Sequence, residues 1–188
     1  AIKINPNFAE AYNNRANILN EFKKFNEALE DCYKSITINP VNAKAYYNRA
    51  IVQKELKQLN MAIESSNLAI KYNPNYAEAY KNKGHIFAEL KNFEEAVESF
   101  SQAFKINPNL AEAFSNMGAA LKDKGELDAA IESNKKALKI NPYYAEAYNN
   151  MGNVLHSKGE LDAAIESYKK ALKNKPDLAG AYNNMGLA

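Results

Sequence analysis

One asparagine recurs every 34 residues along the chain, and its side chain is the group best suited to repeated contacts with a ligand. The six copies are Asn14, Asn48, Asn82, Asn116, Asn150 and Asn184. A carboxamide carries an NH2 donor and an oxygen acceptor, so it can bond both the N–H and the C=O of one extended peptide unit. One such residue per repeat predicts a ladder that holds a peptide by its main chain, with little regard for the peptide's sequence.

Residues that usually catalyse reactions or bind metals are sparse. The two histidines, His85 and His156, fall two repeats apart, and neither has a cysteine or a second histidine at the spacing of a metal site. The glycines stand at packing or turn positions, and none forms a phosphate-binding loop. The one cysteine, Cys32, is interpreted as a small, partly buried thiol inside a helix. We therefore expect no catalytic residue, no metal and no cofactor, and predict that the chain is not an enzyme.

The elements that position the asparagines are marked by the prolines, which share the same period: Pro6, Pro40, Pro74, Pro108, Pro142 and Pro176. A fixed period means that each period is one structural unit. If the third residue after each proline is position one, full repeats span 9–42, 43–76, 77–110, 111–144 and 145–178, with partial repeats at 1–8 and 179–188. The period predicts a single array over 1–188, which we interpret as part of a longer array or a larger protein.

Each repeat has the pattern of two antiparallel helices. Position four is aromatic, position eight is alanine or glycine, and position 20 is alanine. Helices pack closely where a small side chain on one helix lies opposite a large side chain on its neighbour, and these positions supply both. In the fifth repeat the helices are predicted at Glu146–Lys158 and Asp162–Asn174. The second helices are predicted to end at an Asn-Pro pair, because proline disfavours helix in the residue before it.

The turn between the two helices differs along the chain. Lys-Gly-Glu-Leu-Asp, which supplies a C-terminal glycine and an acidic helix start, occurs at Lys124–Asp128 and Lys158–Asp162. The first three repeats have Lys23, Lys57 and Lys91 in place of that glycine. We expect their turns to be less favourable.

The period, the aromatic residue, the small residues and the proline together resemble the tetratricopeptide repeat, and the resemblance covers the whole chain. It implies an all-α fold: an α-solenoid in which antiparallel helical hairpins form a right-handed superhelix. In that arrangement the first helices line a concave groove and the second helices form the convex back. The resemblance also implies a scaffold for protein–protein interaction.

The predicted groove combines the asparagine ladder with side chains at positions five and nine. The ladder resembles the one in the superhelix of O-GlcNAc transferase. The further predicted groove residues are Asn13, Asn17, Tyr47, Lys81, His85, Asn149 and Asn153. The surface is polar, which favours an extended polar peptide over an apolar helix. Acidic residues at positions two and thirteen suggest a ligand with basic character, or are ordinary solvated helix surface.

A specialised groove of the family, which clamps the two carboxylates of a chaperone tail, is not present. Lys81 matches the first residue of that clamp, but His85 stands where asparagine is required. Glu146 and Asn150 stand where the clamp has cations. Binding of such a tail is therefore disfavoured.

Three alternatives remain open from the sequence. The asparagines could bond the neighbouring repeat instead of a ligand. The array could be a self-assembling structural scaffold, because both ends fall inside repeats and have no polar capping helix, which favours self-association through uncapped ends. It could also be the substrate-recognition arm of a larger enzyme such as a glycosyltransferase.

Composition excludes several classes of partner. Lys and Arg number 24 against 22 Asp and Glu, so no general electrostatic attraction to nucleic acid is expected. No apolar run approaches the roughly 20 residues that span a bilayer, and no signal peptide is visible, so no membrane insertion is expected. With one cysteine, no disulfide can form within the chain, in keeping with a reducing compartment. The expected location is cytoplasmic.

Overall fold

The computed structural model describes residues 5–187, in which all regular secondary structure is α-helical. It divides into two compact units, Ala1–Leu90 and Lys91–Ala188, and each is described by itself. The first unit contains α1 (Ala9–Glu21), α2 (Phe25–Ile38), α3 (Ala43–Glu55), α4 (Leu59–Tyr72) and α5 (Ala77–Glu89). The second contains α6 (Phe93–Ile106), α7 (Ala111–Lys124), α8 (Leu127–Ile140), α9 (Ala145–Ser157), α10 (Leu161–Asn174) and α11 (Ala179–Met185).

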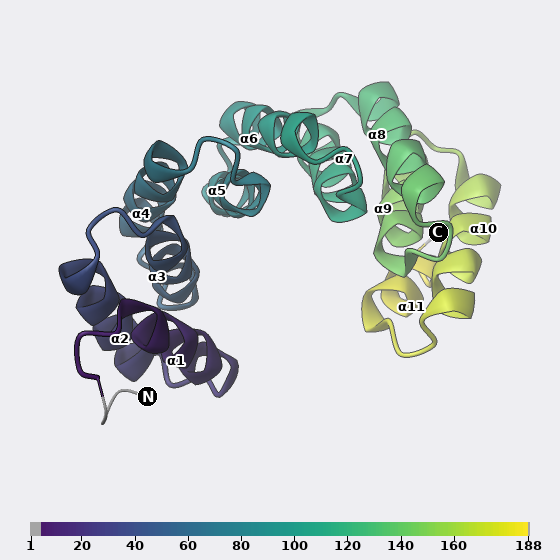
Figure 1. Ribbon diagram of the computed structural model, residues 1–188. Helices are drawn as coiled ribbons and strands as arrows, with labels where there is room; N and C mark the ends of the chain where they lie inside the picture. The colour runs from purple at the N-terminus through teal and green to yellow at the C-terminus, as the bar shows by residue number, and fades with distance from the viewer. Residues whose placement is uncertain (1–4, 188) are drawn as a thin grey trace. The chain divides into compact units, whose positions relative to one another are not determined.

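Helical hairpins are the building blocks of both units (Figure 1). In the first unit α1 packs on α2 and α3 on α4; in the second α7 packs on α8 and α9 on α10. The predicted helices of the fifth repeat are confirmed to within one residue at each end, as α9 and α10. The all-helical solenoid predicted from the repeat is thus confirmed, while the prediction of one continuous array over all repeats remains a prediction.

Successive first helices lie against one another within each unit. Contacts join α1 to α3 and α3 to α5 in the first unit, and α7 to α9 and α9 to α11 in the second. Over residues 5–187, no comparable contact joins one second helix of a unit directly to the next. Because the first helices are closer to one another, their exposed faces form the inner surface of each unit, here called the first-helix row.

The small residue at position eight allows close packing, as the sequence predicts. A Cβ atom added to Gly118 would lie 2.9 Å from Cγ of Asn134, and one added to Gly152 would lie 2.6 Å from Cδ1 of Tyr168. Real Cβ atoms essentially never come this close to another atom. The large residue at position 24 therefore requires glycine opposite it, whereas repeats with Cys32 or Ser66 at position 24 have alanine at position eight.

The turns confirm the cost expected where glycine is replaced. Gly125 and Gly159 have φ of 92° and 80°, and Lys23, Lys57 and Lys91 adopt the same left-handed region with φ of 58°, 59° and 62°. A side chain makes this conformation unfavourable by roughly 1–2 kcal/mol. The first three turns thus keep the shape of the glycine turns at an energetic cost.

The Asn-Pro pairs end the second helices through a side-chain contact. Asn39, Asn73, Asn107 and Asn141 directly follow α2, α4, α6 and α8. Each Oδ1 accepts a hydrogen bond from the backbone N–H two residues later, at 3.1 to 3.3 Å. This contact bridges the proline, which has no N–H of its own, and it sets the direction in which the next first helix starts.

Candidate functional site

The ladder asparagines lie on the first-helix row but differ in their exposure. In the first unit, Asn14 on α1 is exposed, Asn48 on α3 is partly exposed, and Asn82 on α5 is only 6% exposed. In the second unit, Asn116, Asn150 and Asn184 are all partly exposed. Asn82 also donates to Ser66 Oγ on α4 at 3.4 Å, so its side chain faces the interior of its unit.

Three ladder asparagines use their NH2 groups to bind the preceding repeat. Nδ2 of Asn48 donates to Oδ1 of Asn13 at 2.9 Å, and Nδ2 of Asn150 donates to Oγ of Ser115 at 3.0 Å. Nδ2 of Asn184 donates to Oδ1 of Asn149 at 3.2 Å. The acceptor is in each case the residue at position five of the repeat before. The bond to the neighbouring repeat, which the sequence left as an alternative, is therefore present at these three positions.

These bonds orient the carboxamides and leave their oxygens available. Within residues 5–187, no donor binds Oδ1 of Asn48, Asn150 or Asn184. A carboxamide is planar, so fixing its nitrogen against the preceding repeat also fixes where its oxygen points. The group thus offers an oriented acceptor, and not the combined donor and acceptor suggested by the side chain alone.

The other predicted groove residues have varied surroundings. Asn13 is 5% exposed because Asn48 covers it, and exposed Asn17 donates to Glu21 at 3.4 Å. The ring of Tyr47 lies 5.0 Å from that of Tyr76. The remaining four, which are all partly exposed, are Lys81, His85, Asn149 and Asn153.

A pocket of about 430 Å³ brings part of the predicted site together in the first unit. Its walls are Asn13, Asn14, Asn17, Ile18, Lys44, Asn48 and Tyr76, from α1, α3 and the turn before α5. Four of these are predicted groove asparagines. Ile18 and Tyr76 were not predicted, because one is an ordinary core type at position ten and the other belongs to a turn. The pocket confirms that the first-helix row of this unit is hollowed.

Two acidic residues of the first-helix row are paired with lysines. Lys175 Nζ lies 2.8 Å from Oε1 of Glu146, and its hydrogen bond is the main reason that the pKa of Glu146 is lowered. Glu89 at position thirteen is 2.6 Å from Lys57. These carboxylates are partly neutralised, so they give little support to a basic ligand.

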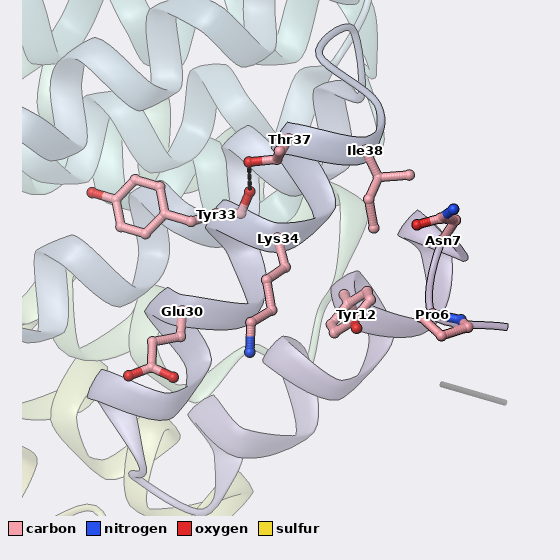
Figure 2. A pocket seen from close by; sticks show the side chains of 8 residues that line it. All are labelled: Pro6, Asn7, Tyr12, Glu30, Tyr33, Lys34, Thr37 and Ile38. Carbon is pink, nitrogen blue, oxygen red and sulfur yellow. Dashed lines mark hydrogen bonds between the residues drawn. The ribbon is translucent and has the colours of Figure 1, made fainter. Parts of the chain in front are cut away.

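A separate pocket of about 500 Å³ lies between the segment before α1, the first turn of α1 and the part of α2 from Glu30 to Ile38 (Figure 2). Its lining includes Pro6, Tyr12 and Ile38, with Nζ of Lys34 5.9 Å from the Tyr12 ring centroid, and it contains no predicted groove residue. At internal junctions the equivalent aromatic is covered by a residue of the preceding repeat, as Phe104 stacks on Phe114 at 4.6 Å. The residue at the equivalent place before Tyr12 is Ile2, which lies outside the described residues.

The one thiol of the chain lies in the interior of the first unit. Cys32 is fully buried, and burial raises the pKa of its thiol to about 12, so it remains protonated at neutral pH. Over residues 5–187, no group of three or more histidine, cysteine or acidic side chains could hold a metal ion. No helix in this part of the chain combines the length and apolar character needed to cross a membrane.

Comparison with known families agrees with the hairpin geometry. A family model described as "TPR repeat" matches residues 84–125, 118–159 and 152–188, and two models described as "Tetratricopeptide repeat" match 9–42 and 32–64. The chain belongs to the tetratricopeptide repeat family. This fold generally mediates protein–protein interactions, and its members are generally non-catalytic scaffolds.

Solved structures of the family are similar along nearly the whole chain. YrrB, described as a tetratricopeptide repeat protein with an unusual peptide-binding site, is 25% identical with a TM-score of 0.73, and the match covers 97% of this chain and 94% of YrrB. MamA is 26% identical with a TM-score of 0.76, covering 87% and 96%. PilF of Pseudomonas aeruginosa, at 21% identity and a TM-score of 0.84, covers 94% and 80% and shows the fold alone. No curated protein matches the chain by sequence.

Proposed function

We propose that this tetratricopeptide repeat chain is a protein-interaction scaffold that binds an extended peptide along the first-helix row of a unit. The observation that carries the proposal is the set of oriented acceptors, Oδ1 of Asn48 in the first unit and Oδ1 of Asn150 and Asn184 in the second. Within residues 5–187 none of these oxygens has a protein donor, while the NH2 group of each is held by the preceding repeat. Main-chain N–H groups of a peptide are the complementary donors. A ligand held in this way is selected mainly by its extended backbone.

The spacing of the row suits an extended chain. Packed helices lie about 8–10 Å apart, and an extended peptide advances about 3.3 Å per residue. Where neighbouring first helices both carry an acceptor, as α9 does with Asn150 and α11 with Asn184, one acceptor therefore meets the peptide about every third residue. The similarity to YrrB, whose description includes a peptide-binding site, supports a ligand of this class.

Substitution of the three acceptors tests the proposal. The probe is a fluorescein-labelled dodecapeptide selected on the wild-type chain from a random displayed library. Each lost hydrogen bond costs about 0.5–1.5 kcal/mol. The triple change of Asn48, Asn150 and Asn184 to alanine, which removes the acceptors of both units, is therefore expected to weaken binding roughly 2- to 150-fold, for one bond lost in the first unit or two in the second. The matched control changes Glu64, Glu132 and Glu166, exposed on the second helices, to alanine and should bind normally.

Circular dichroism separates loss of the site from loss of the fold. The alanine variants must keep the wild-type helix signal at the assay temperature. An unchanged dissociation constant in the folded triple variant would show that the asparagines only join neighbouring repeats.

Self-association is a second candidate function, favoured by one exposed apolar surface on α1. Ile18 is 51% exposed and Phe22 is 73% exposed. Val52 and Val154 occupy the position of Ile18 in the second and fifth repeats, and they are at most 1% exposed. Val52 and Val154 lie on first helices that contact the first helix before them, so the first helix of a second copy would fit α1 in the same way. Light scattering over a concentration series should show oligomers that the double change of Ile18 and Phe22 to lysine removes.

A further inference from the structure

The second unit contains a polar pocket of about 220 Å³ on its first-helix row. Its lining comes from four helices and the end of the described chain: Lys122 on α7, Asn153, His156 and Ser157 on α9, Tyr168 on α10, and Asn184 and Leu187. Asn153 and Asn184 belong to the predicted groove. Lys122, His156 and Tyr168 bring chemistry that the acceptor ladder does not use.

Two hydrogen bonds fix the direction of the Asn153 carboxamide. Its Oδ1 accepts from the hydroxyl of Tyr168 at 2.9 Å and from Nδ2 of Asn184 at 2.8 Å. With both acceptor directions in use, the oxygen of Asn153 has little capacity left for a ligand. Its Nδ2 group makes no hydrogen bond within residues 5–187, so it is an oriented donor beside the pocket.

Two further lining groups are donors, while Oδ1 of Asn184 is the acceptor already described for the ladder. Lys122 presents an ammonium group and His156 a ring N–H. The hydroxyl proton of Ser157 is used, because its Oγ donates to the backbone oxygen of Asn153 at 3.0 Å. A pocket with a surplus of N–H donors and a cation complements negatively charged oxygen atoms.

We propose that this pocket binds an anionic oxygen group, a carboxylate or a phosphate. This inference deepens the proposed function, since it supposes that the group belongs to a peptide on the first-helix row. The acceptor ladder contacts the peptide main chain and selects little for sequence, whereas this pocket would select for one side chain. The peptide residue that faces the end of α9 is then acidic or phosphorylated.

Tyr168 is a positioning residue for this pocket. Its ring is 1% exposed and reaches the first-helix row from α10 because position eight of the repeat is Gly152. At position 24 the other repeats have cysteine, serine, phenylalanine and asparagine, none of which carries a phenol. The orientation of Asn153 by a phenol hydroxyl therefore belongs to the fifth repeat alone.

The charges around the pocket leave Lys122 as its available cation. Lys122 is shared with the half-exposed carboxylate of Asp123 at 2.9 Å, a surface pair that contributes little and that an anion can replace. Lys158, next to the pocket, is paired with Asp128 and Glu160. On α11 no side chain is charged.

Sulfate is the probe, because it presents anionic oxygen atoms and no peptide backbone. NMR titration at constant pH and ionic strength should give saturable shifts of the His156 ring and the Asn153 side-chain amide. Changing Tyr168 to phenylalanine should weaken binding about three- to tenfold, since one positioning hydrogen bond is lost.

A matched control and a second set of ligands complete the test. Lys139→Gln removes an exposed charge of the same unit away from the pocket and should bind sulfate normally, while Lys122→Gln with His156→Gln should not. The peptides Ac-Ala-Asp-Ala-NH2, Ac-Ala-pSer-Ala-NH2 and Ac-Ala-Ser-Ala-NH2 distinguish a carboxylate from a phosphate source. Linear shifts up to 100 mM sulfate, or unchanged binding by the double variant, would overturn the inference. Because sulfate has no main-chain N–H group for the ladder oxygens to bind, this result is independent of peptide binding.

Discussion

The replacement of Gly152 by alanine tests how the fifth repeat is packed. Its new Cβ would lie 2.6 Å from Cδ1 and 2.8 Å from Cζ of Tyr168, whereas ordinary contacts begin near 3.4 Å. The ring is 1% exposed, and its hydroxyl is bonded to Asn153 at 2.9 Å, so it has little freedom to retreat. The backbone of α9 or the tyrosine must move.

The expected loss of stability follows from three contributions. Overpacking of a core costs about 1–3 kcal/mol. Displacement of the ring weakens its hydrogen bond to Asn153, worth about 1 kcal/mol. Alanine is about 1 kcal/mol better than glycine inside a helix, which offsets part of the loss. The net destabilisation is about 2 kcal/mol.

The same change should have the opposite sign when Tyr168 is serine. Ala50 and Ser66 occupy positions eight and 24 in the second repeat, so this pair is already used by the chain. In the Tyr168→Ser background, Gly152→Ala should therefore stabilise the protein by about 1 kcal/mol, through helix propensity and partial filling of the cavity. The coupling energy between the two sites is then about 3 kcal/mol.

Urea unfolding followed by circular dichroism at 222 nm measures these differences. The curves are fitted with a nearest-neighbour model, in which each repeat has its own stability and an interface energy with the next repeat, because long repeat arrays do not unfold in one cooperative step. Gly180→Ala, where an added Cβ meets nothing within 4 Å, is the control for helix propensity. Equal effects of Gly152→Ala in the two backgrounds would refute the packing explanation.

Further predictions concern a turn, a cap, an ion pair and the thiol. Lys23→Gly should raise the free energy of unfolding by about 1 kcal/mol in urea, because φ at this turn is 58°. Asn141→Ala should lower the free energy of unfolding by about 1 kcal/mol, because Oδ1 of Asn141 no longer accepts a hydrogen bond from the backbone N–H of Tyr143. An unchanged free energy would mean that the proline alone shapes the turn. The pKa of Glu146 is lowered by its hydrogen bond with Lys175, so the ion pair stabilises the fold above the ordinary glutamate pKa. This stabilisation is lost as the pH falls through the lowered pKa of Glu146. The melting temperature of Lys175→Met should therefore decrease less than that of the wild type between pH 6 and pH 3. Cys32, with a pKa of about 12, should react with iodoacetamide at pH 8 at least roughly 100-fold more slowly than in urea.

The repeat could be predicted from the sequence because each of its signals is local. Asn-Pro pairs, turn glycines and small residues act over a few bonds or between adjacent helices, so the ends of α9 and α10 were predicted to within one residue. The sequence also predicted a less favourable turn at Lys23, where glycine is absent, and the left-handed conformation of this lysine gives the physical reason.

The chemistry of the candidate site was less accessible from the sequence. An asparagine side chain gives no sign of whether its NH2 group is already bonded, and this depends on the residue at position five of another repeat, as with Asn150 and Ser115. The burial of Asn82 depends in the same way on its contact with Ser66. The hydroxyl of Tyr168 reaches the first-helix row only because Gly152 lies beside its ring, and this pairing is visible in the sequence only when the two positions are compared across repeats.

Replacement of single peptide bonds in the ligand tests the central claim most directly, because the protein remains unchanged. An ester in place of an amide removes one N–H donor from the peptide and leaves every side chain intact. In the selected dodecapeptide, esters at the one or two positions whose N–H groups meet an acceptor should each weaken binding about 3- to 10-fold, while esters at the other positions should have little effect. Where Asn150 and Asn184 are both used, the two sensitive positions should lie about three residues apart. Uniformly unchanged affinity across the series would contradict recognition of the peptide main chain by the oriented acceptors of Asn48, Asn150 and Asn184.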